Sequence, residues 1–313
     1  MVACVGDRLA PGHYTVDDIP EDVARFAHIP DMLPVGSPGK VGLLDLTFER
    51  RSDRTELVGH YQKTPLQITR PLYYDPARPD LPYVILMSTG GGILQGDRHR
   101  LDFTCAAGAS VHLTTQAATK IYRMEQDYAT QLVSITVGPG GYLEYLPDPV
   151  IPFAESRFYQ RTRVSLDPTA TAILGETVLA GRLARGERHA YTAYCTDLEV
   201  HAPDGTLLMA DPIRLIPAKS PVTGPAVFSD YGAMATLYVL TSAVPAADLA
   251  DALHETAQVS GLPAGASTLP GDVGAWARLL APESPEATAT LNHLWDTARR
   301  LITGTPAPDR RKP

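Results

Sequence analysis

Short segments in which apolar and polar residues alternate recur along this chain, and they restrict its fold more than any other feature. The segments 133–137 and 158–166 are clear examples, and a period of two residues is that of a strand with one buried face. Turn-forming sequences such as Pro139-Gly140-Gly141 separate the segments. Residues 41–240 are therefore predicted to be mainly β, as a sandwich, a barrel or a β-helix-like stack.

A glycine-rich turn, Gly90-Gly91-Gly92-Ile93-Leu94-Gln95-Gly96-Asp97, invites two enzyme interpretations, and both fail. A dinucleotide-binding fingerprint needs a third glycine where Gln95 stands, and it must open a helix. A phosphate-binding loop needs Lys and then Ser or Thr after its last glycine, but Asp97-Arg98 follows. Because residues 101–105 alternate, the turn is expected to join two strands.

Charge and cysteine content exclude several classes of protein. The net charge of -8 and the pI of about 5.6 argue against nucleic acid as a partner. Cys4, Cys105 and Cys195 are widely spaced, which favours buried free thiols over disulfides or a zinc site. The sequence shows neither a signal peptide nor an apolar run that could span a bilayer, so we expect no membrane and a cytoplasmic location.

Three regions are expected along the chain. Residues 1–40 are predicted to be a loosely ordered N-terminal extension, residues 41–304 a single β-rich domain, and residues 305–313 a disordered tail. Two helices are expected near the C-terminus, at about 246–258 and 285–302, with Ser284 capping the second and Gly304 ending it. The second helix carries one apolar stripe, which consists of Ala287, Leu291, Leu294, Ala298 and Leu301.

Histidine and nucleophile patterns give no support to a metal cage or a covalent catalyst. His254-Glu255 lacks the second histidine of a zinc motif, because Gln258 stands at that position. His112 lies between Val111 and Leu113 in a strand pattern, and we expect it to be solvated or hydrogen-bonded.

Four acidic residues, Asp97, Glu144, Glu176 and Asp211, lie within or beside apolar runs. A buried carboxylate needs a partner or water, since an unpaired charge is costly to bury. The chemistry favours ion pairs with Arg182 or Arg214, and the alternative is a hydrated interior passage for a cation.

Five ordered blocks then identify a family resemblance. They are Gly91 to Asp97, Thr114 to Tyr122, Leu143 to Pro147, Arg157 to Thr162, and Gly175-Glu176 to Gly181-Arg182. With the segment Pro65 to Tyr73 they strongly resemble the urease accessory protein D family, called UreD or UreH, over about residues 41–240. The resemblance implies a β-helix-like, stacked-sheet scaffold of many short strands with two late helices.

The resemblance also implies a function without catalysis. A member of this family would bind apo-urease, with its subunits UreA, UreB and UreC, together with UreF and the GTPase UreG. Nickel would reach the urease site through a polar passage, so Ni²⁺ would be bound transiently and no cofactor tightly. A conduit must release its ion, and scattered carboxylates and hydroxyls suit that task better than a His and Cys cage.

Matched position by position, Asp97, Thr119, Glu176 and, more loosely, Asp211 are the candidate nickel-passage residues. Gln95 departs from the family pattern, in which Gly is frequent, and would add bulk beside the path. The second late helix, with Trp295 beside its stripe, could contact UreF, although packing against its own β body is favoured.

Two other functions stay open at this point. The chain could be a passive scaffold that carries no metal. It could also be a carbohydrate-active β-rich enzyme with Asp148 and Glu155 as acid and base, although nothing in the sequence fixes the separation of these two carboxyl groups.

Overall fold

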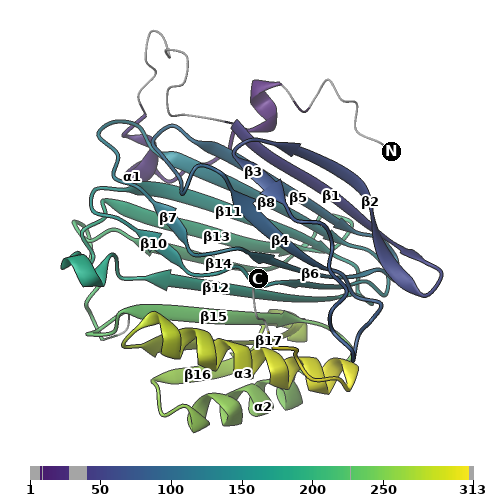
Figure 1. The fold of residues 1–313 in the computed structure, drawn as a ribbon. Helices are drawn as coiled ribbons and strands as arrows, with labels where there is room; N and C mark the ends of the chain where they lie inside the picture. The colour runs from purple at the N-terminus through teal and green to yellow at the C-terminus, as the bar shows by residue number, and fades with distance from the viewer. Residues whose placement is uncertain (1–7, 9, 28–40, 226, 310–313) are drawn as a thin grey trace.

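Two large β-sheets face each other, and two helices cover the outer face of one of them (Figure 1). The structure is a computed structural model, and it describes residue 8 and residues 10–27, 41–225 and 227–309. The prediction of a mainly β protein with helices near the C-terminus is confirmed.

Sheet A has seven strands and sheet B has ten. In spatial order, sheet A consists of β14 (Leu207–Leu215), β13 (Ala193–His201), β11 (Arg157–Leu166), β8 (Ala129–Val137), β5 (Arg98–Cys105), β1 (Val41–Arg51) and β2 (Arg54–Lys63). Sheet B consists of β16 (Ala264–Thr268), β17 (Gly274–Ala281), β15 (Ala233–Leu240), β12 (Thr171–Leu179), β9 (Tyr142–Tyr145), β6 (Ser110–Thr115), β4 (Tyr83–Ser88) and β3 (Leu66–Ile68). Two further short strands extend it, since β10 (Val150–Pro152) pairs with β12 and β7 (Thr119–Ile121) pairs with β10.

Between β4 and β13 the chain alternates between the two sheets. Strands β5, β8, β11 and β13 pair in parallel in sheet A, and β4, β6, β9 and β12 do so in sheet B. The tight turns at one end stack as well, because Gly138 N–H donates to the Cys105 carbonyl (2.8 Å) and Asp167 N–H to the Val137 carbonyl (3.0 Å). A chain that contributes one strand to each sheet per turn is β-solenoid-like, which confirms the stacked-sheet prediction.

Helices α2 (Ala246–Val259) and α3 (Ser284–Thr303) lie close to the predicted ranges. Gly304 ends α3 with φ of 71°, as predicted, but Glu283 rather than Ser284 is the N-cap and makes no side-chain capping bond. Leu301 is 44% exposed, so it does not share the burial of the rest of its stripe. After the helix, Ala307 N–H donates to the carboxylate of Asp296 (2.7 Å), and residues 310–313 lie outside the described residues.

The apolar faces of α2 and α3 pack on the outer face of sheet B. Leu253 and Leu294 are fully buried there, in one cluster with Leu237 of β15 and Leu279 of β17. The α3 stripe therefore serves mainly to hold the helix against its own β body. None of the described helices is both long enough and apolar enough to cross a membrane.

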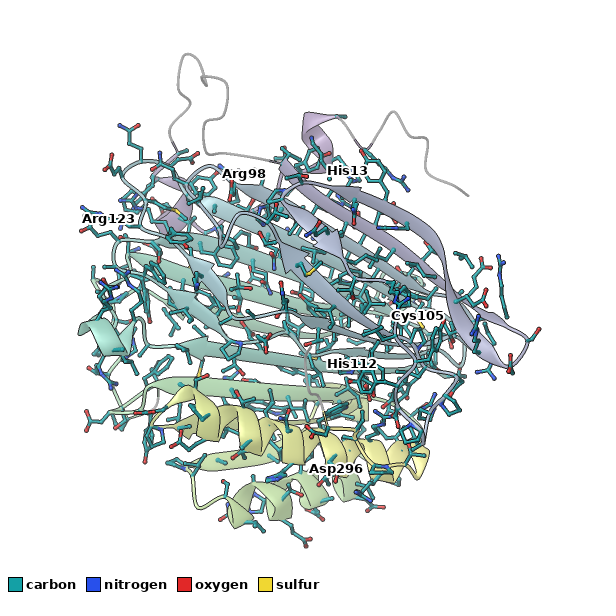
Figure 2. All side chains as sticks on the ribbon, viewed as in Figure 1. His13, Arg98, Cys105, His112, Arg123 and Asp296 are labelled. Atoms are coloured by element: carbon teal, nitrogen blue, oxygen red, sulfur yellow. The ribbon has the colours of Figure 1, made fainter. Side chains whose placement is uncertain are left out.

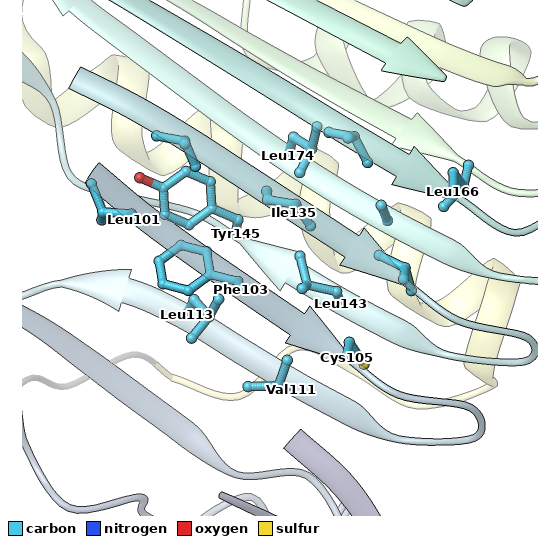
Figure 3. Close-up of a cluster of buried hydrophobic side chains, with 14 of the residues drawn as sticks. Leu101, Phe103, Cys105, Val111, Leu113, Ile135, Leu143, Tyr145, Leu166 and Leu174 are labelled. Carbon is cyan, nitrogen blue, oxygen red and sulfur yellow. The ribbon is translucent and has the colours of Figure 1, made fainter. Parts of the chain in front are cut away.

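The largest apolar cluster lies between the sheets (Figure 3). Leu101 and Phe103 of sheet A share this cluster with Val111 and Leu113 of sheet B, and Phe103 lies beside Leu113. A second interior cluster contains Phe158 and other residues near the opposite ends of the strands. The alternating positions identified in the sequence are thus the ones that build the interior.

The described part of the N-terminal extension packs against sheet A. It contains a short 3-10 helix η2 (Pro11–His13) and the helix α1 (Glu21–Ala24). Val23 is fully buried, in a cluster with Tyr159 and the free thiol of Cys195. Residues 1–7, 9 and 28–40 of the predicted extension lie outside the described residues.

Candidate functional site

A cavity of about 290 Å³ lies between the two sheets. Its walls come from the strands of both sheets and from the glycine-rich turn. The polar side chains that line it are Ser88, Thr115, Gln116, Thr119, Lys120 and Asp148 near the turn, His99, Gln131, Gln160 and Thr162 on sheet A, Glu176 and Thr177 on β12, and the tyrosines Tyr145, Tyr194 and Tyr238.

One row of polar residues crosses the inner face of sheet A. His99 is in register with Gln131, Gln131 with Gln160, and Gln160 with Thr196. The amide of Gln131 donates to Gln160 (3.0 Å), and that of Gln160 donates to the hydroxyl of Thr162 (3.2 Å). Because in-register parallel strands place equivalent positions side by side, one polar residue per strand is enough to make a continuous row.

A second row crosses sheet B at the same level. Glu176 of β12 is in register with Thr236 of β15, and Thr236 with Arg278 of β17. We call the two rows together the polar layer: His99, Gln131, Gln160, Thr196, Glu176, Thr236 and Arg278. It separates the two interior apolar clusters.

Glu176 is the one acidic residue in the polar layer. The hydroxyl of Tyr194 donates to its carboxyl group (3.1 Å). Burial raises the pKa of Glu176, and the hydrogen bond from Tyr194 and the charge of Arg278 offset only part of this rise. A carboxylate in this position would gain from a passing cation, since a nearby positive charge favours its ionised form.

Thr119 reaches the cavity because the glycine-rich turn packs closely against β7. Ile93 N–H donates to the Lys120 carbonyl (2.7 Å), and Tyr122 N–H donates to the Ile93 carbonyl (2.9 Å). A Cβ atom on Gly92 would lie 2.5 Å from the Lys120 carbonyl oxygen, so no residue with a side chain fits there. The glycine-rich turn and the segment Thr114 to Tyr122, which are two of the five sequence blocks, therefore form a single wall of the cavity.

Asp97 lies behind this wall and does not line the cavity. Its carboxylate accepts the N–H of Leu94 (2.8 Å), which closes the glycine-rich turn. The ring nitrogen Nε2 of His99, which does line the cavity, is 3.7 Å from Asp97 Oδ2. Burial lowers the pKa of His99 and outweighs the opposing effect of Asp97, which favours a neutral imidazole.

Asp211 of β14 lies on the other side of the cavity. The hydroxyl of Tyr238, a lining residue, donates to its carboxylate, and Arg278 forms an ion pair with it (2.6 Å). Of the four candidate residues, Thr119 and Glu176 line the same cavity, and Asp97 and Asp211 each contact a lining residue from outside.

Comparison with known proteins gives the same family as the sequence motifs, and the match covers most of the chain. The family described as UreD urease accessory protein matches residues 40–313. The chain belongs to the UreD urease accessory protein family. It is 54% identical over 293 residues to the urease accessory protein UreD 2 of Streptomyces griseus, covering 93% of this chain and 100% of that relative. It is also 40% identical to UreD of Haloarcula marismortui over 278 residues (89% and 92% of the two chains) and 36% identical to UreD 2 of Brucella suis over 291 residues (92% and 96%).

The side chain of Gln95 has a local structural role. Its side-chain oxygen accepts the N–H groups of Glu125 (3.1 Å) and Gln126 (3.4 Å). Gln95 is not among the residues that line the cavity, so its side chain adds no bulk there.

The paired carboxylates of a glycosidase are not brought together in this UreD fold. Asp148 lines the cavity, where the hydroxyl of Thr115 donates to it (3.1 Å). Glu155 is 53% exposed and forms an ion pair with Arg123 (2.8 Å). The geometry therefore gives no support to an acid and base pair made of these two residues.

The predicted arginine partners of the buried acidic residues were wrong. Arg182 pairs with Glu187, and Arg214 pairs with Asp197 (2.7 Å). The arginines that do the pairing are Arg278, which contacts Asp211, and Arg299, which lies 3.8 Å from Glu144. Periodicity could have indicated the face on which each arginine lies, since Arg278 alternates with the residues of β17 that pack under the helices and Arg299 lies one helical turn after Trp295, but it does not identify the acidic partner.

Glu144 belongs to a buried network between sheet B and α3. It accepts hydrogen bonds from His112 (2.7 Å), Tyr142 (2.6 Å) and the Trp295 indole (2.9 Å). Figure 2 shows His112 close to α3. Burial alone would raise the pKa of Glu144, but His112, Arg299 and Tyr142 outweigh it and lower the pKa to about 2. His112 is thus hydrogen-bonded, as the sequence predicted, and it serves the packing of α3.

Across the described residues, no group of three or more His, Cys, Asp or Glu side chains is placed to hold a metal ion. The cavity has a different set of polar groups, in which amides, hydroxyls, one imidazole, the carboxyl groups of Asp148 and Glu176 and one basic residue, Lys120, share the lining. Such donors can bind a divalent cation weakly and in succession.

Proposed function

We propose that the chain acts in the cytoplasm as a scaffold that binds apo-urease together with UreF and the GTPase UreG. Membership of the UreD family supports a role in urease maturation. The cavity between the sheets then serves as a passage for Ni²⁺ on its way to the urease active site. In this proposal the chain is a metallochaperone and catalyses no step itself.

The observation that carries the passage is the polar layer itself. Glu176, Gln160 and His99 lie in a sandwich interior that is otherwise filled by apolar side chains. Burying polar groups is costly, so a fold that needed only stability would place apolar residues at these positions. The cavity that they line is large enough for an ion together with several of its water molecules.

The metal-binding groups of the cavity are better suited to an ion that passes through than to a metal ion that stays bound. Nickel(II) binds imidazole and thiolate cages tightly, whereas amide and hydroxyl oxygens are weak ligands for it. Conduction requires binding that is favourable enough for entry and weak enough for release. Asp148 and Glu176 are the two carboxyl groups of the lining, and among the described residues they belong to no cluster of three or more possible ligands, which favours successive weak sites over one trap.

A passive scaffold is the second candidate, and one matched pair of variants separates the two. Glu176→Gln removes the carboxylate from the cavity at nearly constant volume, and Glu255→Gln makes the same change at an exposed position of α2. Each variant is co-expressed with the urease subunits, UreF and UreG, the complex is isolated by pull-down, and the nickel bound to urease is measured.

A passage predicts that Glu176→Gln lowers the nickel content severalfold with the complex intact, while Glu255→Gln matches the wild type. If both variants load urease equally, the carboxylate in the cavity has no part in transfer and the passive scaffold is favoured. If Glu176→Gln abolishes the pull-down, the residue supports assembly and the passage loses its main argument.

A further inference from the structure

The polar row of sheet B continues to the edge of the sheet. Beyond Glu176 and Thr236 it reaches Arg278, and the residue in register with Arg278 on the edge strand β16 is Gly265. A Cβ atom added to Gly265 would meet nothing within 4 Å. Arg278 is therefore the last side chain of the row, and the space beyond it is open.

Arg278 is held by three residues around it. Its guanidinium pairs with Asp211 (2.6 Å), donates to the hydroxyl of Thr236 (2.9 Å) and lies 3.3 Å from the hydroxyl of Tyr238. The side chains of Arg278 and Asp211 remain 28% and 25% exposed. The ion pair thus has one side toward the interior and one side toward solvent.

A second hollow, of about 410 Å³, lies on the solvent side of this ion pair. It follows the seam between the last strand of sheet A and the last strands of sheet B, and Ile213, Met234, Gly265 and Arg278 are among its walls. Tyr238 lines the interior cavity, and Arg278 lines this outer hollow. The two spaces are therefore separated by the side chains of Tyr238, Asp211 and Arg278.

We propose that the seam between β14 and β17 is a second mouth of the interior cavity, and that Arg278 closes it and selects against free passage of cations. The proposal rests on the proposed function for the identity of the cation, but its geometry does not depend on urease. While Arg278 pairs with Asp211, its positive charge stands between the outer hollow and Glu176. When the guanidinium turns toward solvent, Asp211 and Glu176 become two successive acidic positions on one path.

The partial exposure of the ion pair between Arg278 and Asp211 to solvent makes such a movement of the guanidinium feasible. Ion pairs that solvent reaches contribute little to stability, so opening this one costs less than opening a fully buried pair. A partner with its own acidic group at the seam could attract Arg278 away from Asp211. The mouth would then open only within a complex.

A thiol placed behind Arg278 tests the second mouth on the full-length chain without urease or nickel. Thr196→Cys is a small change at a buried position on the interior side, because the Thr196 side chain is hydrogen-bonded to Glu176 of the cavity lining. The background carries Cys4→Ser, and the native thiols Cys105 and Cys195 react slowly because burial raises the pKa of each to about 12. The probes are a cationic and a neutral methanethiosulfonate reagent.

We expect Arg278→Met to speed the reaction with the cationic reagent by an order of magnitude, and more than the reaction with the neutral reagent. Arg278→Lys keeps the charge and should stay slow. Gly265→Phe, added to Arg278→Met, should restore slow labelling because the ring fills the open space beyond the row. Arg163→Met, at a position 54% exposed, is the control for loss of an arginine and should change neither rate.

Unchanged rates in a folded Arg278→Met variant would overturn the second mouth. Equal acceleration of both reagents would overturn the charge selection and leave Arg278 as a steric plug. Because nickel transfer is measured separately, failure of the labelling test does not touch the proposed passage, and failure of the Glu176→Gln test does not touch the second mouth.

Discussion

The buried network under α3 gives a sharp test of how the helix is held. The side chain of Arg299 is completely buried, forms an ion pair with Asp75 and donates to the hydroxyl of Tyr83 (2.7 Å). Methionine fills a similar volume without charge, so Arg299→Met leaves Asp75 buried without its counter-ion. Glu144 keeps three other hydrogen-bond donors, and the loss therefore falls mainly on Asp75.

The expected effect can be estimated from the cost of leaving one buried charge unpaired, which is about 3–5 kcal/mol. An unfolding entropy of about 2.1 cal/mol/K per residue gives about 0.66 kcal/mol/K for a chain of 313 residues, so Tm should fall by about 5–8 °C. The neighbouring Arg300 provides a matched control, because it is 57% exposed and pairs with Asp296 one helical turn earlier (2.7 Å). Such a surface pair contributes about 0.3–0.5 kcal/mol, so Arg300→Met should lower Tm by less than about 1 °C.

The assay is thermal unfolding followed by circular dichroism at one fixed scan rate, because large chains often unfold irreversibly. Asp75→Asn combined with Arg299→Met should cost less than the sum of the single changes, since it removes the charge that was left unpaired. Equal losses in Arg299→Met and Arg300→Met would refute the reasoning, because burial would then have no influence on the cost.

Two further predictions concern the N-terminal segment and the response to acid. Val23→Asp places a charge in the buried cluster beneath α1, so it should lower Tm and speed proteolytic cleavage of residues 10–27. Val259→Asp, at a position 89% exposed, is the control and should do neither. Equal proteolysis of the two variants would show that this segment is not held by Val23. Burial, assisted by the charge of Arg188, lowers the pKa of His189 to about 4. Since an unfolded histidine titrates near about 6.5, the unfolded state binds the proton first and stability should fall as the pH drops from about 6.5 to about 4. His189→Asn, which tolerates the backbone φ of 50°, should reduce the difference in urea midpoint between pH 7 and pH 5, and an unchanged difference would contradict this assignment.

The strands could be predicted because burial imposes a period of two on the sequence. Leu101 and Phe103 point to the core, as their alternation indicated. The pattern assigns a face to each residue but says nothing about what lies opposite. That is why Glu176 could be flagged as a buried acid while Tyr194, its hydrogen-bond donor from the facing sheet, could not be found.

The candidate site was only partly accessible to sequence reasoning for the same reason. Thr119 and Glu176 meet in one cavity because the solenoid winding brings β7 and β12 together through β10. Pairing of Arg278 with Asp211 and of Arg299 with Asp75 joins segments 67 and 224 residues apart. No local pattern encodes contacts of that range, so the partners Arg182 and Arg214 were chosen wrongly.

The nickel content of urease purified from cells that express its subunits and the other accessory proteins, with this chain present or deleted, tests the central claim most directly. The account predicts nickel-loaded, active urease when the chain is present, and urease of normal abundance that lacks nickel when it is deleted. Full nickel loading without the chain would contradict a role in maturation, whatever the geometry of the cavity.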